Sequence, residues 1–322
     1  MAVSLVGAES ARGRLARTAA GDFSGVIRRL LQAVLAVGVF GSLTLAGVFL
    51  LSEFRLRHVD APGGFVAEIP GDPETIAYGR HVARIRGCFG CHGQQLQGAV
   101  FTEQWPWVER AVAPNLAEYA REHSPAVLEA AIRQGIGRDG RALWSMPSYN
   151  WANLSDADLI ALIAYLRSAE VITAELPAPK LGWRARWRIA TGADEHMAAW
   201  VKMVPELQFA DHPDPAIRRG EYLAMTMCNE CHGLDLRGAD NADGSAPDLA
   251  VLGAYTDEDF RVLMKTGTAL GGRDKLNLMS MIARDRFSAL TEEELTSLLT
   301  FLRTLPERPL RQNAPWRNQT DE

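Results

Sequence analysis

The stretch CFGCH at residues 88–92 recurs as CNECH at residues 228–232, and both copies read C-x-x-C-H. Together the two copies contain all four cysteines of the 322-residue chain. C-x-x-C-H is the pattern by which a c-type haem is attached to a protein. Cysteines one helical turn apart can each form a thioether to the same porphyrin, and the histidine that follows can reach the iron as its proximal ligand. The duplicated motif therefore predicts two covalently bound haem c groups.

Other uses of a C-x-x-C pair explain the pattern less completely. A thioredoxin-like redox pair needs a βαβ context, which the sequence does not show. Two such pairs can build a zinc site, but they are then roughly 15–20 residues apart, and here each distant pair carries its own histidine. A pair of structural disulfides is conceivable in an oxidising compartment. The haem interpretation assigns the thioethers to Cys88, Cys91, Cys228 and Cys231 and the proximal iron ligands to His92 and His232.

The charge of the chain is distributed unevenly. The formal net charge is −5, but residues 1–57 hold seven arginines and three acidic residues, so this segment is +4 and the remainder is −9. An acidic remainder argues against a nucleic-acid partner and could suit a basic protein partner. A solvated acidic surface is the simpler explanation.

Residues 30–52 contain no charged side chain and directly follow Arg28 and Arg29. A helix needs roughly 20 apolar residues to cross a bilayer. The run exceeds the roughly 7–15 residues of a signal-peptide core, and no clean cleavage site follows it. We therefore expect an uncleaved, single transmembrane helix in a bacterial inner membrane. The preceding arginines place the N-terminus in the cytoplasm and everything after Glu53 in the periplasm.

The two motifs belong to a longer internal repeat. A middle helix is expected at residues 124–134 in one half and 256–265 in the other. The last helix of each half begins at Ser155 or Thr291, with an acidic residue three positions later, which is typical of a capping box. Its apolar side chains recur at positions i, i+3, i+4 and i+7, one stripe of an amphipathic helix. No useful strand pattern appears, so both halves are expected to be all-α.

Each half resembles a class I cytochrome c domain. The shared order is an N-terminal helix, C-x-x-C-H, a proline loop, a middle helix, a methionine loop and a last helix ending in an aromatic-leucine pair. The resemblance covers about residues 73–170 and 214–306. It implies a small all-α fold in which the N- and C-terminal helices cross and the haem fills the core.

The expected organisation has seven segments. The connection between the domains contains Trp183, Trp187 and Trp200 and is too apolar for a free linker, so we expect it to fold over both domains. The segments are a cytoplasmic N-terminal segment (1–29), a transmembrane helix (30–52), a tether (53–72), cytochrome c domain 1 (73–170), an interdomain connection (171–212), cytochrome c domain 2 (213–306) and a C-terminal tail (307–322).

The resemblance also implies a distal methionine ligand to each iron, which gives the His/Met ligation of an electron-transfer haem. In the first half, Met146 is the only methionine between the motif and the last helix. In the second half, Met279 and Met281 compete. The sequence LMSMIARDRFSALT at 278–291 resembles the distal loop of cytochrome subunits whose ligand holds the place of Met279, so Met281 is the alternative. Methionine as a flexible core residue is the other interpretation of each.

Pro114 and Pro247 occupy matching Ala-Pro-x-Leu sequences in the two halves. They correspond to the family position whose carbonyl accepts a hydrogen bond from the proximal imidazole. Such a bond fixes the ring and makes the ligand more basic. A loop proline without a special role is the alternative.

These features predict an electron carrier rather than an enzyme, and no catalytic residue is assigned. The expected role is relaying electrons in a respiratory chain. The donor would be a quinol-oxidising complex or a dehydrogenase, and the acceptor an oxidase or a soluble cytochrome.

Two other kinds of role remain open. The strongest is the cytochrome subunit of a periplasmic alcohol- or aldehyde-oxidising complex, because of the second methionine loop. The other is a dihaem enzyme. A dihaem peroxidase needs an iron that peroxide can reach, which a methionine in both loops argues against. Dihaem thiosulfate-oxidising enzymes depend on a cysteine ligand, and no cysteine is left over.

Overall fold

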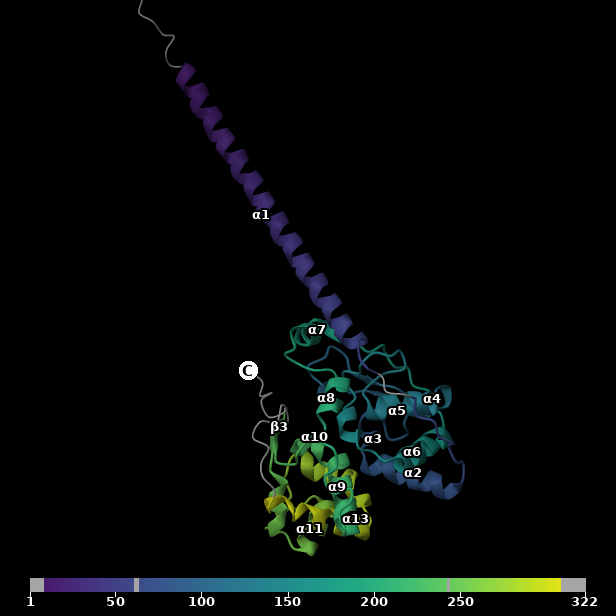
Figure 1. Cartoon of the computed structure of the whole chain (residues 1–322). Helices are drawn as coiled ribbons and strands as arrows, with labels where there is room; N and C mark the ends of the chain where they lie inside the picture. Colours follow the sequence, from purple (N-terminus) through teal and green to yellow (C-terminus); the bar gives the residue numbers. More distant parts are fainter. Residues whose placement is uncertain (1–8, 61–63, 242–243, 308–322) are drawn as a thin grey trace, which may run out of the picture. The chain divides into compact units, whose positions relative to one another are not determined.

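A computed structural model describes residues 9–60, 64–241 and 244–307 of the chain. It divides into two units, residues 1–53 and 54–322. Helix α1 (Glu9–Arg57) is a single continuous helix (Figure 1). Its part from Gly25 to Arg57 has a mean hydropathy of 2.3 in its most apolar window, so it is long and apolar enough to cross a membrane. The first five residues of the expected tether, 53–57, continue this helix because no proline or glycine interrupts it there.

The first domain is built almost entirely of helices, which confirms the expected fold class. Its α2 and α6 lie side by side (Figure 1), and a two-stranded antiparallel pair closes the loop after the motif. The elements are α2 (Pro73–Ile85), α3 (Cys88–His92), β1 (Ala99–Val100), η1 (Thr102–Gln104), β2 (Val112–Ala113), α4 (Leu116–Glu122), α5 (Pro125–Arg133), η2 (Ser148–Trp151) and α6 (Asp156–Ser168).

The second domain repeats this plan, with α9 and α13 side by side in place of α2 and α6 (Figure 1). Its short strands also pair antiparallel after the motif. The elements are α9 (Pro215–Met227), α10 (Asn229–His232), β3 (Ala239–Asn241), β4 (Gly244–Ala246), η3 (Leu249–Ala254), α11 (Asp257–Thr266), α12 (Leu278–Asp285), η4 (Phe287–Ala289), α13 (Glu292–Leu302) and η5 (Leu305–Glu307).

Both predicted starts of the last helices are present, with one difference. Thr291 forms a complete capping box with Glu294 at the start of α13. Ser155 accepts a hydrogen bond from the backbone N–H of Asp158 at 3.1 Å, but the Asp158 carboxylate does not return to the cap. It is used by other partners, which lie at the interface between the domains.

Each pair of terminal helices crosses at a glycine. A Cβ at Gly79 would overlap the carbonyl oxygen of Ala161, and a Cβ at Gly220 would overlap that of Ser297. Any side chain would therefore collide with the backbone of the facing helix. Glycine is required here because it alone lets the two backbones approach this closely.

Replacing Gly79 by alanine is expected to destabilise the first domain by about 1–3 kcal/mol, the usual cost of overpacking. Gly71→Ala is the matched control, because a Cβ there would have nothing within 4 Å. Denaturant unfolding of the two variants measures the difference. Equal midpoints for Gly79→Ala and the parent chain would contradict the close crossing.

The connection packs on both domains and forms two helices, α7 (Gly182–Thr191) and α8 (Met197–Met203). Ile189 is buried in a cluster with Val108 of the first domain. Towards the second domain, the Glu221 carboxylate accepts hydrogen bonds from the backbone N–H groups of Gln208 and Phe209 at 2.8 and 2.6 Å. Trp183 and Trp187 contribute less to this packing than expected, because their side chains stay largely exposed.

Candidate haem-binding sites

Each attachment motif forms a single helical turn, α3 in the first domain and α10 in the second. Residues three apart on a helix face the same side, so both cysteines of a pair can reach one porphyrin edge. No disulfide joins any of the four cysteines, so each is available to form a thioether. Burial raises the pKa of the Cys88 thiol to about 11 and that of Cys228 to about 12. The thiols therefore stay protonated near neutral pH before a thioether forms.

Each motif histidine is held by the carbonyl of the predicted proline. The Nδ1 atom of His92 lies 2.9 Å from the Pro114 oxygen, and that of His232 lies 2.8 Å from the Pro247 oxygen. A carbonyl only accepts, so Nδ1 carries the proton and Nε2 keeps its lone pair for a metal. Burial lowers the pKa of both histidines, although the carbonyl bonds oppose the shift. Both rings are thus favoured in the neutral, ligating form and fit a haem iron.

The short strand pairs bring the proline loops back to the histidines. Ala99 pairs with Ala113 in the first domain, and Ala239 pairs with Ala246 in the second. Each proline directly follows the second strand. Strands of two or three residues are too short to leave a periodic signal, which is why the sequence did not reveal them.

The three methionine candidates have different surroundings. Met146 is half-buried and packs against the first domain's core. Met279 packs in the same way against the core of the second domain, whereas Met281 is 53% exposed. A ligand to a buried iron has to face the core, so these positions favour Met279 over Met281.

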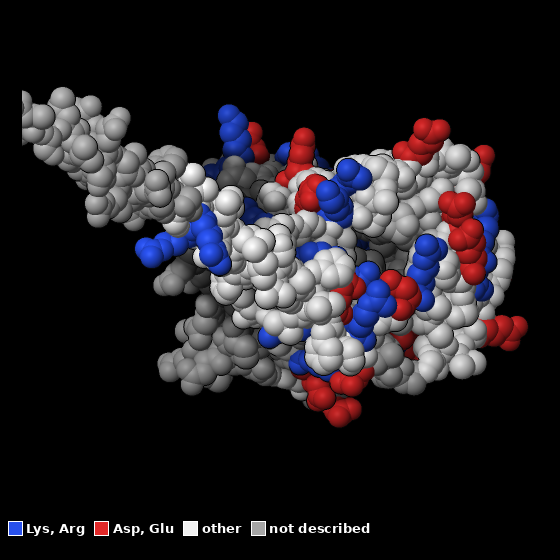
Figure 2. Space-filling view, turned by 90° about the horizontal axis from the view of Figure 1, so that it is seen from above, with Lys and Arg blue, Asp and Glu red and all other residues white. Residues whose placement is uncertain are grey.

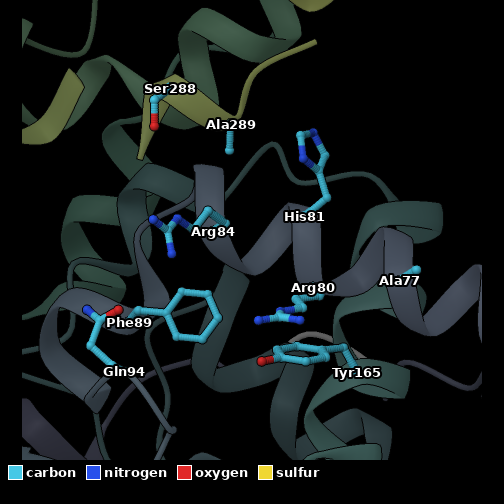
Figure 3. Close-up of a pocket in the computed structure, with 9 residues that line it drawn as sticks. All are labelled: Ala77, Arg80, His81, Arg84, Phe89, Gln94, Tyr165, Ser288 and Ala289. Carbon is cyan, nitrogen blue, oxygen red and sulfur yellow. The ribbon is translucent and has the colours of Figure 1, made fainter. Parts of the chain in front are cut away.

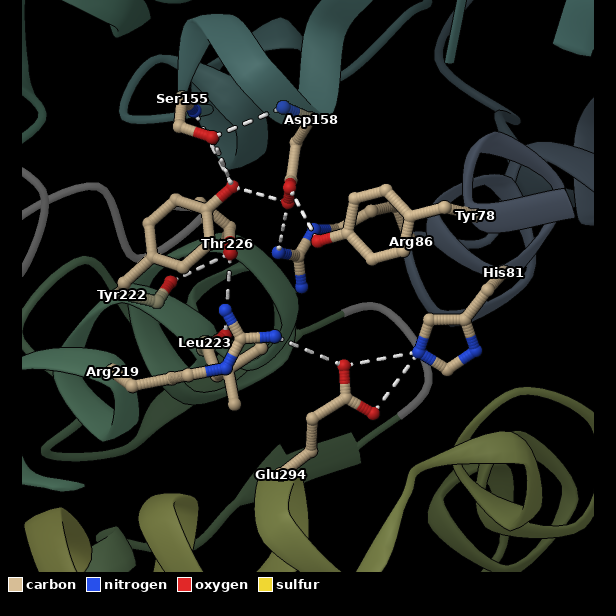
Figure 4. Close-up of polar contacts among 10 residues, drawn as sticks. All are labelled: Tyr78, His81, Arg86, Ser155, Asp158, Arg219, Tyr222, Leu223, Thr226 and Glu294. Carbon is tan, nitrogen blue, oxygen red and sulfur yellow. Dashed lines mark hydrogen bonds and ion pairs between the residues drawn. The ribbon is translucent and has the colours of Figure 1, made fainter. Parts of the chain in front are cut away.

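A buried polar cluster joins the two domains at the start of α6 (Figure 4). The Asp158 carboxylate accepts hydrogen bonds from the hydroxyls of Tyr78 at 2.7 Å and Tyr222 at 2.5 Å. It also pairs with Arg86 at 3.3 Å, and the side chains of Arg86 and Asp158 are 1% and 7% exposed. Burial and the bond to Asp158 raise the pKa of Tyr78 to about 12, so its hydroxyl remains a donor at physiological pH. Tyr222 comes from the second domain and the others from the first.

A second cluster crosses the interface in the opposite direction. The Nε2 atom of His81 in the first domain lies 3.0 Å from both carboxylate oxygens of Glu294 in the second. Arg219 pairs with the same carboxylate at 3.4 Å (Figure 4). Burial raises the pKa of Glu294, but the bonds from His81 and from the backbone of Thr291 outweigh it, so the net shift is downward. Glu294 is therefore a buried carboxylate that stays ionised.

These two clusters are related by the internal repeat. His81 and Tyr222 each lie two residues after a crossing glycine, and Asp158 and Glu294 each lie three residues after a helix cap. Each pair joins the first helix of one domain to the last helix of the other, as in a two-fold symmetric interface. Both acids stand at the capping-box position in the sequence, but that position does not predict their use between the domains.

A cleft of about 390 Å³ opens at the same interface (Figure 3). Arg80 and Arg84 of α2 line one wall, and Ser288 and Ala289 of η4 line the other. Phe89, a residue of the first attachment motif, also lines it. Solvent therefore reaches the interface beside the first motif, on a wall that carries positive charge.

Comparison with known proteins agrees with this architecture. The sequence profile described as Cytochrome c matches residues 76–170 and 217–306, more than half of the chain. A nicotinate dehydrogenase subunit of Pseudomonas putida is 26% identical over 246 residues, which are 72% of this chain and 20% of that protein. The chain thus spans about a fifth of the length of that relative. Because the matched segments are the two in which helices cross and a proline carbonyl orients the motif histidine, the chain belongs to the cytochrome c family, whose domains bind haem c covalently and transfer electrons.

Proposed function

We propose that this chain is a dihaem electron carrier that relays electrons between proteins on the periplasmic side of a bacterial inner membrane. The observation that carries the proposal is the duplication of a complete site: two cysteine pairs, each with a buried histidine whose Nδ1 is held by a proline carbonyl. One such site would serve a single-step carrier. Two sites in contacting domains allow electrons to pass through the chain.

In this proposal the haems supply a one-electron redox couple, and the protein holds and tunes them. Cys88 and Cys91 fix one porphyrin, and Cys228 and Cys231 fix the other. His92 and His232 are the proximal ligands. Met146 and Met279 are the distal ligands, and a thioether in this position raises the potential. Pro114 and Pro247 orient the proximal rings.

The proposed anchor is the apolar part of α1. Its charge-free run, residues 30–52, is long enough to span the hydrocarbon core, and arginines precede it. The positive-inside rule then places both haem domains outside the cytoplasm. Release of the protein from isolated membranes by high salt alone would contradict an integral anchor.

The donor and acceptor are proposed as proteins. The relay would accept electrons from a quinol-oxidising complex or a periplasmic dehydrogenase and pass them to an oxidase or a soluble cytochrome. Figure 2 shows acidic and basic side chains interspersed on one face of the described residues. This mixed surface favours recognition by local complementarity rather than by a broad single-sign field.

A second candidate is the electron-accepting cytochrome component of a dehydrogenase complex. The similarity to a protein named as a nicotinate dehydrogenase subunit favours it. Co-purification distinguishes the two roles: a complex component stays with a cofactor-bearing partner through detergent extraction and gel filtration, whereas a free relay elutes alone.

The distal ligand of the second haem gives a direct test of the proposed sites. Met279→Ala is expected to open one iron, so that this haem binds carbon monoxide and loses its His/Met absorption band. Met281→Ala is the matched control and should leave both haems closed, because Met281 is exposed. The opposite result would assign the ligand to Met281. Ready binding of carbon monoxide by the parent protein would contradict the relay and favour a peroxidase-like role.

A further inference from the structure

Arg286 of the second domain lies against the attachment motif of the first. A Cβ on Gly87 would overlap the Arg286 guanidinium, and a Cβ on Gly90 would come within 3.2 Å of its Nη2 atom. Gly90 lies inside the CFGCH motif, and Gly87 directly precedes it. A cation from one domain thus contacts the backbone that holds the other domain's haem.

The first domain makes room for Arg286 with a residue that the second domain lacks. Eight residues separate the crossing Gly79 from the first cysteine of its motif, but only seven separate Gly220 from the corresponding cysteine in the second domain. The additional residue is Gly87, which adopts a left-handed φ of 80° and separates α2 from α3. In the second domain α9 continues into α10 without such a break. The Arg286 contact is therefore specific to the first motif.

The charge of Arg286 is only loosely neutralised. Its Nη1 atom lies 4.0 Å from the nearer carboxylate oxygen of its ion-pair partner, Glu230. Burial raises the pKa of the Cys88 thiol, and Arg286 is the largest influence against that rise. The positive field of Arg286 therefore extends to a sulfur that would carry the first haem.

Among the described residues, the first domain places no comparably loosely paired charge beside the second attachment motif. The first domain's η2 reaches the second motif with neutral groups: the Tyr149 carbonyl accepts a hydrogen bond from Asn229 at 3.5 Å. The positive charge of Arg86 acts on Cys228 and opposes the rise in the pKa of its thiol. Arg86 is, however, paired with the buried Asp158 at 3.3 Å. Each domain thus places groups beside the attachment motif of the other domain. In the part of the chain that the structure describes, a loosely paired charge lies only beside the first motif.

The helix before Arg286 also reaches the other haem site. Arg286 directly follows α12, whose second residue is Met279, the proposed ligand of the second iron. A helix of this length spans about 12 Å. One short helix of about two turns therefore connects the proposed iron ligand of one haem with the cation beside the other.

We propose that the second domain sets the midpoint potential of the first haem through Arg286. The inference rests on the proposed function, because it requires a haem at each motif. A ferric haem carries one more positive charge than a ferrous haem, so a neighbouring cation favours the reduced form. Arg286 therefore raises the potential of the first haem and directs electrons towards it from the second.

Redox titration of the full-length protein in detergent tests this inference. Arg286→Gln is expected to lower the ferrous-to-ferric ratio of the first haem roughly three- to tenfold at a fixed ambient potential, where tenfold equals about 59 mV for one electron. The second haem should change less. Arg286→Lys should restore most of the effect. Met146→His identifies the wave, meaning the reduction step in the titration, that belongs to the first haem, because losing Met ligation lowers the potential of that haem.

The matched control is Arg261→Gln, which removes a cation of the same domain from α11, where it pairs with Glu258 and Glu292 instead of contacting the first motif. It should leave both waves in place. Glu230→Gln gives an independent check with the opposite sign, since it removes the counter-charge and should raise the first wave. An unchanged first wave in Arg286→Gln, or an equal shift in Arg261→Gln, would overturn the inference while the His/Met spectra remain intact. Absence of those spectra in the parent protein would instead contradict the proposed function.

Discussion

A chain in which Cys228 and Cys231 are both alanine is expected to carry one covalent haem instead of two. Each C-x-x-C-H segment supplies the only cysteines of its own domain, and the two pairs belong to separate, similarly built helical turns. Intact-mass measurement and haem content per polypeptide should both show the loss of one haem. The second domain should also lose stability, because a haem held in its core contributes apolar contacts that the empty site lacks.

The reciprocal variant, Cys88→Ala with Cys91→Ala, is the matched control and should retain the other haem. If either double variant still binds two haems covalently, or if both lose all haem, the two sites are not independent in the way the repeat implies. The parent chain must carry two haems for the comparison to stand.

Replacing Arg86 by methionine is expected to destabilise the protein by about 3–5 kcal/mol, the usual cost of leaving one partner of a buried ion pair unmatched. Asp158 would keep its two tyrosine donors but lose its counter-ion in a site closed to water. The midpoint of denaturant unfolding measures this loss. Because Tyr222 reaches Asp158 from the second domain, contact between the domains should weaken as well.

A double variant, Arg86→Met with Asp158→Leu, separates the pair from the packing. Replacing both members of a buried pair by apolar residues is often neutral or stabilising, so part of the stability should return, and the rest is lost because Tyr78 and Tyr222 no longer have their acceptor. Comparing the double variant with the two single variants in a double-mutant cycle measures the coupling between the two residues. If the double variant loses as much free energy of unfolding as the two single variants together, the two residues do not stabilise each other.

The parts of this molecule that depend on local pattern could be predicted from the sequence. The middle helices and the caps at Ser155 and Thr291 are visible because helix starts and apolar stripes repeat within a few residues. The duplicated motif predicts the haem sites for the same reason. The Ala-Pro-x-Leu sequences also match between the halves, and the structure shows the hydrogen bond that this match implies.

The contacts between the domains could not be predicted because they join residues far apart in the chain. His81 and Glu294 are separated by 213 positions, and neither shows a pattern that identifies the other. Asp158 is predicted near a helix cap, but its carboxylate has three partners far away in the chain, and one of them, Tyr222, belongs to the other domain. Residues 53–72 are expected to be a tether, whereas residues 53–57 continue α1 and Phe65 and Ile69 pack on the first core.

The burial of the second attachment segment has a consequence for the biosynthesis of the protein. Cys228 is 9% exposed and Asn229 is 1% exposed in the docked chain, and Asn229 donates to a carbonyl of the first domain. Cys231 is half-buried, so the restriction falls on Cys228, whose sulfur an enzyme that forms the thioether cannot reach in this arrangement. We therefore expect the second domain to receive its haem while it is still apart from the first.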